Sequence, residues 1–147
     1  AVTLGTRDGA NIEIAQLAGK DNVFTFGRSE EEVKAIKFAN SYNPWDAYHS
    51  SRKVKEVMDS LISGVFSSDK GQFQMIYDEI RYRNDEFMVL KDFDSYDKAC
   101  EDVQKAYLDR LGWGRKCLAN IANSGWFSSD RTIKEYNDEI WHRRKTH

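Results

Sequence analysis

Proline and cysteine are scarce in this sequence of 147 residues. The single proline, Pro44, argues against long linkers and favours a helix-rich body. The two cysteines, Cys100 and Cys117, form no CxxC pair and have no histidines at metal-ligand spacing, so we expect no metal site. Two isolated thiols of this kind are typical of reduced, cytoplasmic proteins, and we expect that location.

The sequence also lacks an excess of one charge. Lys and Arg number 22 against 24 Asp and Glu, which gives a formal net charge of −2. A dedicated nucleic-acid-binding protein normally carries a basic stripe, so we expect no nucleic-acid partner. No apolar run approaches the roughly 18 residues of a membrane-spanning helix, so we expect no membrane partner either.

The first residues predict a buried strand. Ala1-Val2-Thr3-Leu4 is a short β-branched and apolar run that ends at Gly5. Such a strand needs neighbours on both sides, because an open sheet edge invites aggregation. The chain offers few further strands, so we expect most of the sheet to lie outside it, in a larger α/β protein.

Residues 1–27 together predict a parallel βαβ step. A turn over residues 5–11 leads into a short helix over 12–18, which Gly19 stops. Residues 22–26 are then the second buried strand, ended by Gly27. A right-handed crossover is the strong default for this order of elements.

The rest of the chain predicts mainly helices. Ser29 and Glu32 form a capping box before a helix that directs Val33, Ile36 and Ala39 inward. Apolar residues at helical spacing predict a further helix that starts at residue 51 and that Gly64 ends. The same spacing predicts helices over 73–80, 96–107, 117–122 and 128–144. The fold class is therefore α/β, predominantly helical with two or three strands.

Some segments between these helices are predicted to be irregular or extended. Residues 43–46 suit a linker, and residues 87–90 suit a short edge strand. Asp94 or Ser95 would cap the long helix that follows. The carboxylates at 30–32 and at positions 92, 94 and 97 suit charges near helix N-termini, since nothing apolar surrounds them to raise a pKa.

The loop after the first strand holds the strongest candidates for a ligand site. In open α/β sheets, ligands lie at the carboxyl ends of strands, where a glycine-rich turn meets a helix N-terminus. Gly5 and Gly9 would let the backbone approach a ligand, and Asp8 and Asn11 would supply side-chain groups. The alternative is ordinary turn and N-cap chemistry. No full GxGxxG or Walker pattern is present.

Histidines and tryptophans are weaker candidates. His49 and His142 lack partners at metal spacing and suit surface or cap positions. Aromatic faces can stack on sugar rings, although Trp141 at helical spacing favours a core position. The tryptophans that could line such a sugar site are Trp45, Trp113, Trp126 and Trp141.

The segment from Ser124 to Arg131 suits a corner between two helices. Gly125 would end one helix, the two aromatic residues after it would pack under the corner, and Ser128 or Ser129 would cap the next helix. Neither serine lies in a GxSxG elbow, so we expect no nucleophile here.

Several of these segments resemble one family. Leu4-Gly5-Thr6-Arg7-Asp8-Gly9-Ala10-Asn11-Ile12-Glu13-Ile14 resembles a motif of the α-glucan phosphorylases, which comprise the glycogen, starch and maltodextrin phosphorylases. Asn22-Val23-Phe24-Thr25-Phe26-Gly27 is similar to the next strand of that family. Residues 89–96 fit its helix entry, and residues 124–133 with 136, 140 and 141 resemble its closing helix.

The resemblance implies a two-domain GT-B architecture, with residues 1–147 as the C-terminal part of the cofactor-bearing Rossmann-like domain. The helix over 128–144 would cross back to the other domain. The parent enzyme would use pyridoxal 5′-phosphate and orthophosphate to release glucose 1-phosphate from an α-1,4-glucan, with retention. The family resemblance also implies that the intact enzyme is a homodimer.

For this chain the resemblance implies a supporting role. None of its lysines matches the motif of the cofactor lysine, so we expect no catalytic residue here and no cofactor bound by the chain alone. Gly5, Thr6, Asp8, Gly9 and Asn11 would lie near the cofactor pocket, behind the residues that touch it. The chain's partner would be the remainder of the phosphorylase.

Arg7 departs from the family pattern, which usually has Leu or Met at this position. An arginine in an apolar pocket would need a partner such as Asp8 or Glu13. The alternative is that its side chain reaches a surface.

Two other functional classes stay open at this point. The chain could be a non-catalytic module that binds a carbohydrate or a protein, or a scaffold without activity of its own. The missing lysine motif separates both from an independently active enzyme.

Overall fold

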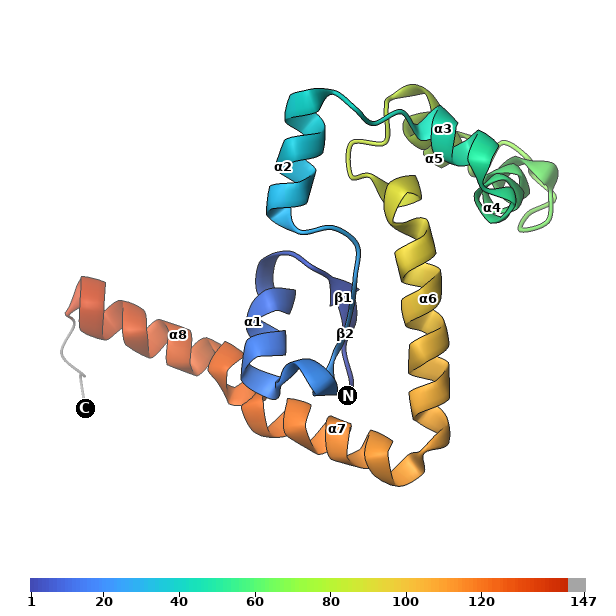
Figure 1. The fold of residues 1–147 in the computed structure, drawn as a ribbon. Coiled ribbons are helices and arrows are strands. Elements are labelled where there is room, and N and C mark those ends of the chain that lie inside the picture. The colour runs from blue at the N-terminus through green and yellow to red at the C-terminus, as the bar shows by residue number, and fades with distance from the viewer. Residues whose placement is uncertain (143–147) are drawn as a thin grey trace. The chain divides into compact units, whose positions relative to one another are not determined.

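The computed structural model describes residues 1–142, which form a mostly helical α/β structure with one two-stranded parallel sheet. The chain forms two compact units (Figure 1). Unit 1 contains residues 1–25 and the chain from Asp102 onward, and unit 2 contains residues 26–101. None of the helices in the described part of the chain has the length and apolar character of a membrane span.

Unit 1 begins with the predicted βαβ step. Strand β1 (Leu4–Thr6) leads into helix α1 (Gly9–Ala18), a short 3₁₀ turn η1 (Lys20–Asn22) and strand β2 (Phe24–Phe26), whose last residue is the first of unit 2. The backbone N–H of Phe24 donates to the carbonyl of Thr3 at 2.9 Å. The parallel step is confirmed, whereas α1 begins three residues earlier than the predicted start at residue 12.

Two details of the strand predictions are wrong. The first strand starts at Leu4 rather than Ala1, and the second starts at Phe24 rather than Asn22. All six strand residues are half-buried rather than buried. The physical reason is that each strand pairs only with the other in the described residues, so one edge of each is open.

The core of unit 1 lies between α1 and the start of β2. Ala15, Ala18 and Val23 are buried there, and Ile14 packs against them. Helix α7 (Arg110–Asn123) packs along α1 and η1. The side chain of Asn120 ties α7 to this core by donating to the carbonyl of Asn22 at 2.8 Å.

The end of unit 1 is a run of short helical segments. The 3₁₀ turn η2 (Ser124–Phe127) leads to α8 (Ser129–Tyr136), which continues as a π-helical turn, η3 (Asn137–Trp141). Figure 1 shows α8 projecting away from α1 and the strands. The predicted closing helix over 128–144 is therefore present up to Trp141, and its last predicted residues, 143 and 144, lie outside the described part.

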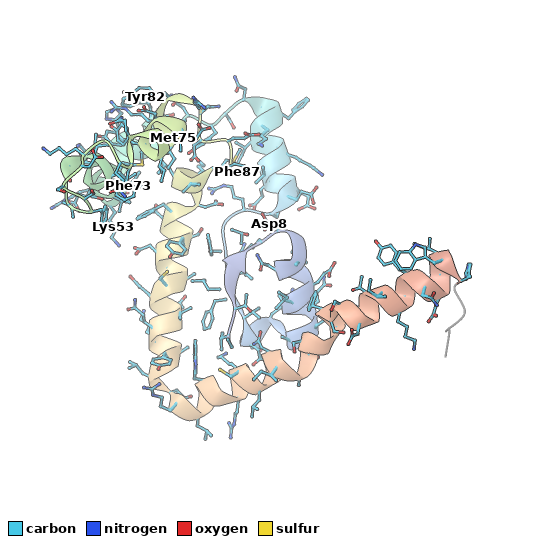
Figure 2. The ribbon with its side chains drawn as sticks, turned by 180° about the vertical axis from the view of Figure 1, so that it is seen from behind. Asp8, Lys53, Phe73, Met75, Tyr82 and Phe87 are labelled. Atoms are coloured by element: carbon cyan, nitrogen blue, oxygen red, sulfur yellow. The ribbon has the colours of Figure 1, made fainter. Side chains whose placement is uncertain are left out.

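Unit 2 is helical. It contains α2 (Glu30–Ala39), α3 (Pro44–Ser50), α4 (Arg52–Ser63), α5 (Gln74–Tyr82) and the first part of α6 (Val89–Leu108), whose C-terminal end belongs to unit 1. Its core comprises Val54, Met58, Tyr77 and Leu90, all 7% exposed or less. Met75, Tyr82 and Phe87 stay exposed, as Figure 2 shows with their side chains as sticks.

The helix predictions of unit 2 are confirmed at several termini. The capping box is present, since Ser29 Oγ accepts from the Glu32 amide and the Glu32 carboxylate accepts from the Ser29 amide. Gly64 follows α4 with φ +94°, a backbone conformation that glycine adopts without strain. Ala39, predicted to face inward, is exposed.

Other predictions for unit 2 are wrong. The predicted linker at 43–46 is the start of α3, where Asn43 caps the helix and Pro44 takes its first position. The predicted edge strand at 87–90 does not form, because Met88 has φ +56° and α6 already begins at Val89. Asp94 and Ser95 consequently lie inside α6 rather than capping it.

Candidate functional site

The loop at residues 5–11 joins the carboxyl end of β1 to the N-terminus of α1, as the sequence predicted. Asp8 precedes α1 at the N-cap position, with extended φ and ψ of −144° and 167°. Its side chain makes no capping hydrogen bond, so the N-cap alternative holds for the backbone position of Asp8 but not for its carboxylate.

The polar side chains of this loop bond to one another. Thr6 Oγ1 donates to Asp8 Oδ1 at 2.6 Å. Asn11 Nδ2 donates to Thr6 Oγ1 at 3.3 Å. The backbone N–H of Asn11 donates to the Asp8 carbonyl at 3.2 Å. Thr6 thus links Asp8 and Asn11, the two residues that were predicted to supply side-chain groups. The local sequence pattern did not point to Thr6, which was included only through the family resemblance.

The two glycines of the loop have different roles. A Cβ atom at Gly5 would lie 2.6 Å from the Asn11 amide group, so Gly5 makes room for Asn11. Gly9 has φ +49°, and a Cβ atom there would meet nothing within 4 Å. The space beside Gly9 is open, while at Gly5 the nearest group is a side chain of the loop itself.

Arg7 lies exposed on this loop. Within residues 1–142 it forms no ion pair with Asp8 or Glu13, the partners that a buried arginine would have needed. The surface alternative is therefore confirmed for Arg7 in this chain.

The loop offers little to hold pyridoxal phosphate directly. It contains no lysine for a Schiff base, and its one cation, Arg7, points to the surface. The polar groups of Thr6 and Asn11 are engaged within the loop. By themselves these residues offer no direct attachment for the cofactor. The described residues also bring together no group of three His, Cys, Asp or Glu that could hold a metal ion.

His49 and His142 occupy surface positions, as predicted. His49 is exposed in the last turn of α3, where its ring stacks on Trp45 with ring centres 5.2 Å apart. His142 is exposed and follows η3 in the left-handed region.

The tryptophans lie in both units and have different neighbours. Trp113 stacks on Phe24 in unit 1 with ring centres 6.5 Å apart. Trp45 instead lies under the guanidinium of Arg81 in unit 2, 4.2 Å from the ring centre. Trp141 packs against Tyr136 and is 52% exposed, so the core position predicted for it is wrong in this chain.

The corner between α7 and α8 forms only partly as predicted, since α7 ends at Asn123 and Gly125 lies inside η2. Ser128 Oγ accepts from the Arg131 amide at 3.1 Å and is the N-cap of α8. The guanidinium of Arg131 lies over the Trp126 ring, 3.3 Å from its centre, and pairs with Glu135 at 2.7 Å. Trp126 and Phe127 remain exposed rather than packed under the corner.

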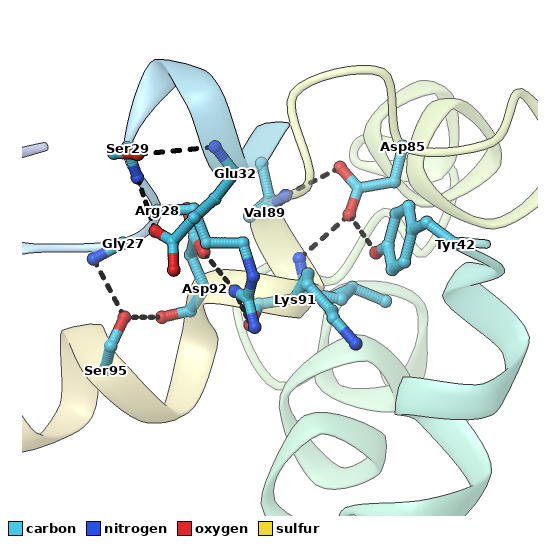
Figure 3. Close-up of polar contacts among 11 residues, drawn as sticks. Gly27, Arg28, Ser29, Glu32, Tyr42, Asp85, Val89, Lys91, Asp92 and Ser95 are labelled. Carbon is cyan, nitrogen blue, oxygen red and sulfur yellow. Dashed lines mark hydrogen bonds and ion pairs between the residues drawn. The ribbon is translucent and has the colours of Figure 1, made fainter. Parts of the chain in front are cut away.

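A polar network in unit 2 was missed by the sequence analysis (Figure 3). Asp85, only 4% exposed, accepts from the amides of Val89 and Leu90 at 2.9 and 2.8 Å and thereby caps α6. The hydroxyl of Tyr42 donates to the same carboxylate at 2.6 Å. Burial, followed by this hydrogen bond, raises the pKa of the Tyr42 hydroxyl far above its usual value. Asp85 lies four residues before the first residue of α6, and an aspartate near a helix start is the sequence signal that could have indicated this cap.

A second part of this network joins α6 to the residues before α2. Arg28 Nη1 lies 2.6 Å from Asp92 Oδ1 and donates to the Lys91 carbonyl at 2.9 Å (Figure 3). The Gly27 amide donates to Ser95 Oγ at 2.9 Å. Asp92 and Ser95, read from the sequence as helix-terminal residues, therefore act as anchors for the segment that follows β2.

Comparison with known proteins gives one consistent result. A family model described as "Carbohydrate phosphorylase" matches residues 1–143. The chain is 44% identical over 141 residues to the glycogen phosphorylase of Bacillus subtilis (strain 168). The matched region covers 96% of this chain and 18% of that protein. It is 41% identical over 142 residues to the glycogen phosphorylase of Synechocystis sp., covering 96% of this chain and 16% of that protein.

A maltodextrin phosphorylase is among these relatives. The protein from Streptococcus pneumoniae serotype 4 is 38% identical over 144 residues, which is 97% of this chain and 19% of that protein. The chain thus spans less than a fifth of the length of these relatives.

Proposed function

Because the chain belongs to the carbohydrate phosphorylase family, we propose that it is the C-terminal portion of an α-1,4-glucan phosphorylase with the GT-B architecture. The observation that carries this proposal is the continuous family match over residues 1–143, which includes the loop between β1 and α1. The names of the relatives favour glycogen or maltodextrin as the glucan.

The proposed reaction is phosphorolysis. The glycosidic bond between C1 of the terminal glucose and the glucan oxygen breaks, and a bond forms between C1 and an oxygen of orthophosphate. The leaving glucan oxygen takes up one proton and orthophosphate gives up one, so the products are glucose 1-phosphate and a glucan shorter by one unit. Pyridoxal 5′-phosphate, when bound, supplies acid and base chemistry through its phosphate group.

In this proposal the loop at residues 5–11 supports the cofactor pocket. Asn11 and Asp8 hold Thr6, and Gly5 leaves room for the Asn11 side chain. The loop's residues orient neighbouring groups and carry no proton in the reaction. The proposal assigns the direct ligands of the cofactor and of phosphate to the rest of the protein, since none of the lysines of this chain matches the motif of the cofactor lysine.

The proposal extends to the setting of the whole protein. It works as a homodimer in the cytoplasm, and the remainder of the phosphorylase is this chain's partner. The free thiols of Cys100 and Cys117 support a reducing compartment.

The test compares the full-length protein with the 147-residue chain. With maltoheptaose and orthophosphate, we expect glucose 1-phosphate from the full-length protein and none from the chain alone. We also expect the chain alone to give no stoichiometric Schiff-base absorption band with pyridoxal phosphate. A full-length protein that releases free glucose instead would overturn the assignment, and a Schiff-base band from the chain would overturn its supporting role.

A further inference from the structure

A polar hollow in unit 2 is not explained by the proposed role of the loop at residues 5–11. The hollow has a volume of about 260 Å3 and is lined mainly by α3, the residues before it and the first turns of α6. Val54 and Leu90, 2% and 7% exposed, form its apolar base. Small-molecule pockets begin at about 300 Å3, so this hollow suits a ligand of about one sugar ring.

Charged groups of both signs line the hollow. Asp46, Lys91 and Asp94 are exposed around it, and the described residues place no ion-pair partner on any of their side chains. Arg28 also lines it, but its Nη1 is committed to Asp92 and to the Lys91 carbonyl (Figure 3). The charge of Arg28 is therefore balanced by Asp92, and the groups left to meet a ligand are one ammonium, on Lys91, and the carboxylates of Asp46 and Asp94.

This arrangement selects for a neutral ligand rich in hydroxyl groups. Each hydroxyl can donate to a carboxylate such as Asp46 or Asp94 and accept from an ammonium such as Lys91. An anion would meet the two carboxylates, and a cation would meet the ammonium of Lys91. The apolar base suits the C–H face of a sugar ring.

We propose that this hollow binds one glucose unit of an α-1,4-glucan. The polyhydroxyl class follows from the lining, while the choice of a glucan rests on the proposed function. Asp46 and Asp94 accept hydrogen bonds from the sugar, and Lys91 donates one.

Amide NMR of the isotope-labelled 147-residue chain during titration with maltoheptaose tests this proposal. We expect saturable shifts at residues 41–51 and 90–94. Asp94→Asn and Lys91→Ala should each weaken binding by on the order of ten-fold, since each removes a charge-assisted hydrogen bond. Asp21→Asn, an exposed change of the same kind in unit 1, should leave binding unchanged. Spectra of the unbound variants show whether each still folds.

Further titrations separate the ligand sources. Weaker binding of glucose than of maltoheptaose supports a glucan site, and equal binding supports the same hollow as a site for free sugar. Shifts with orthophosphate alone, or no shifts with either sugar, would overturn the proposal. None of these measurements involves the cofactor or phosphorolysis. A negative result would therefore rule out the sugar site without bearing on the proposed phosphorylase activity, which the assay of the full-length protein tests separately.

Discussion

The start of α6 depends on one buried carboxylate. Asp85 accepts two backbone hydrogen bonds and one from Tyr42, so a change to Asn removes acceptor capacity while keeping size and tolerance of φ +43°. We expect Asp85→Asn to lower the free energy of unfolding by about 2–3 kcal/mol in urea denaturation. Glu86→Gln, at an exposed neighbouring position, is the control and should change stability little. Equal losses in both variants would contradict the capping role.

Tyr42 makes the stability of this chain sensitive to high pH. An unfolded tyrosine ionises near about pH 10, whereas the folded Tyr42 hydroxyl keeps its proton to higher pH. Its contribution is complete below the unfolded pKa and decreases as the pH rises above it. We expect wild type to lose stability above about pH 10 more steeply than Tyr42→Phe, measured by urea denaturation at each pH. Parallel profiles would show that Tyr42 does not titrate differently in the folded state.

Gly5 is the residue of the candidate site with the least room for a side chain. In the full-length protein, Gly5→Ala should displace Asn11 and break its bond to Thr6. We expect turnover in the phosphorolysis assay to decrease on the order of ten-fold, because small displacements near a reacting centre are costly. Gly114→Ala is the matched control, since a Cβ there meets nothing within 4 Å. An unchanged turnover for Gly5→Ala would contradict the proposal that the loop at residues 5–11 supports the cofactor pocket.

Among the secondary-structure elements, α2 has the most complete local signal for its start. Ser29 and Glu32 exchange hydrogen bonds of 3.3 and 2.8 Å with each other's backbone amides. We expect Ser29→Ala to destabilise α2 by about 1 kcal/mol and to speed hydrogen exchange of its amides. Ser41→Ala, beyond the end of α2, should leave that exchange unchanged. Faster exchange throughout unit 2 would mean that the serine supports more than the helix start.

The elements that the sequence predicted well have their start and stop signals within a few residues. The Ser29–Glu32 box, Gly19 and Gly64 are such signals, and each marks an observed terminus. The segment at 87–90 was misread because four apolar residues in a row suit a strand and a buried helix start equally. Asp85 resolves the ambiguity by capping the helix at Val89 and Leu90.

At the scale of the whole molecule, the two compact units have separate cores. Met58 is 2% exposed in the core of unit 2, so Met58→Ala should cost about 2–5 kcal/mol. We expect amides of residues 26–101 to lose protection in hydrogen exchange, while those of α1 and α7 keep theirs. Met75→Ala, at a position 79% exposed, is the matched control. Uniform loss across both units would mean that the chain unfolds as one cooperative body.

Local sequence determined the βαβ step, most helix termini and the loop at residues 5–11, because each depends on residues close together in the chain. The same motifs pointed to the phosphorylases, and the family match over residues 1–143 assigns the chain to that family. Only the tertiary structure decided that Tyr42 meets Asp85 and Arg28 meets Asp92, pairs 43 and 64 residues apart. It also decided which polar groups surround the hollow beside α3. Such pairs form only when the packing of α3, α4, α5 and α6 has brought their side chains within hydrogen-bonding distance, and no local pattern encodes that distance.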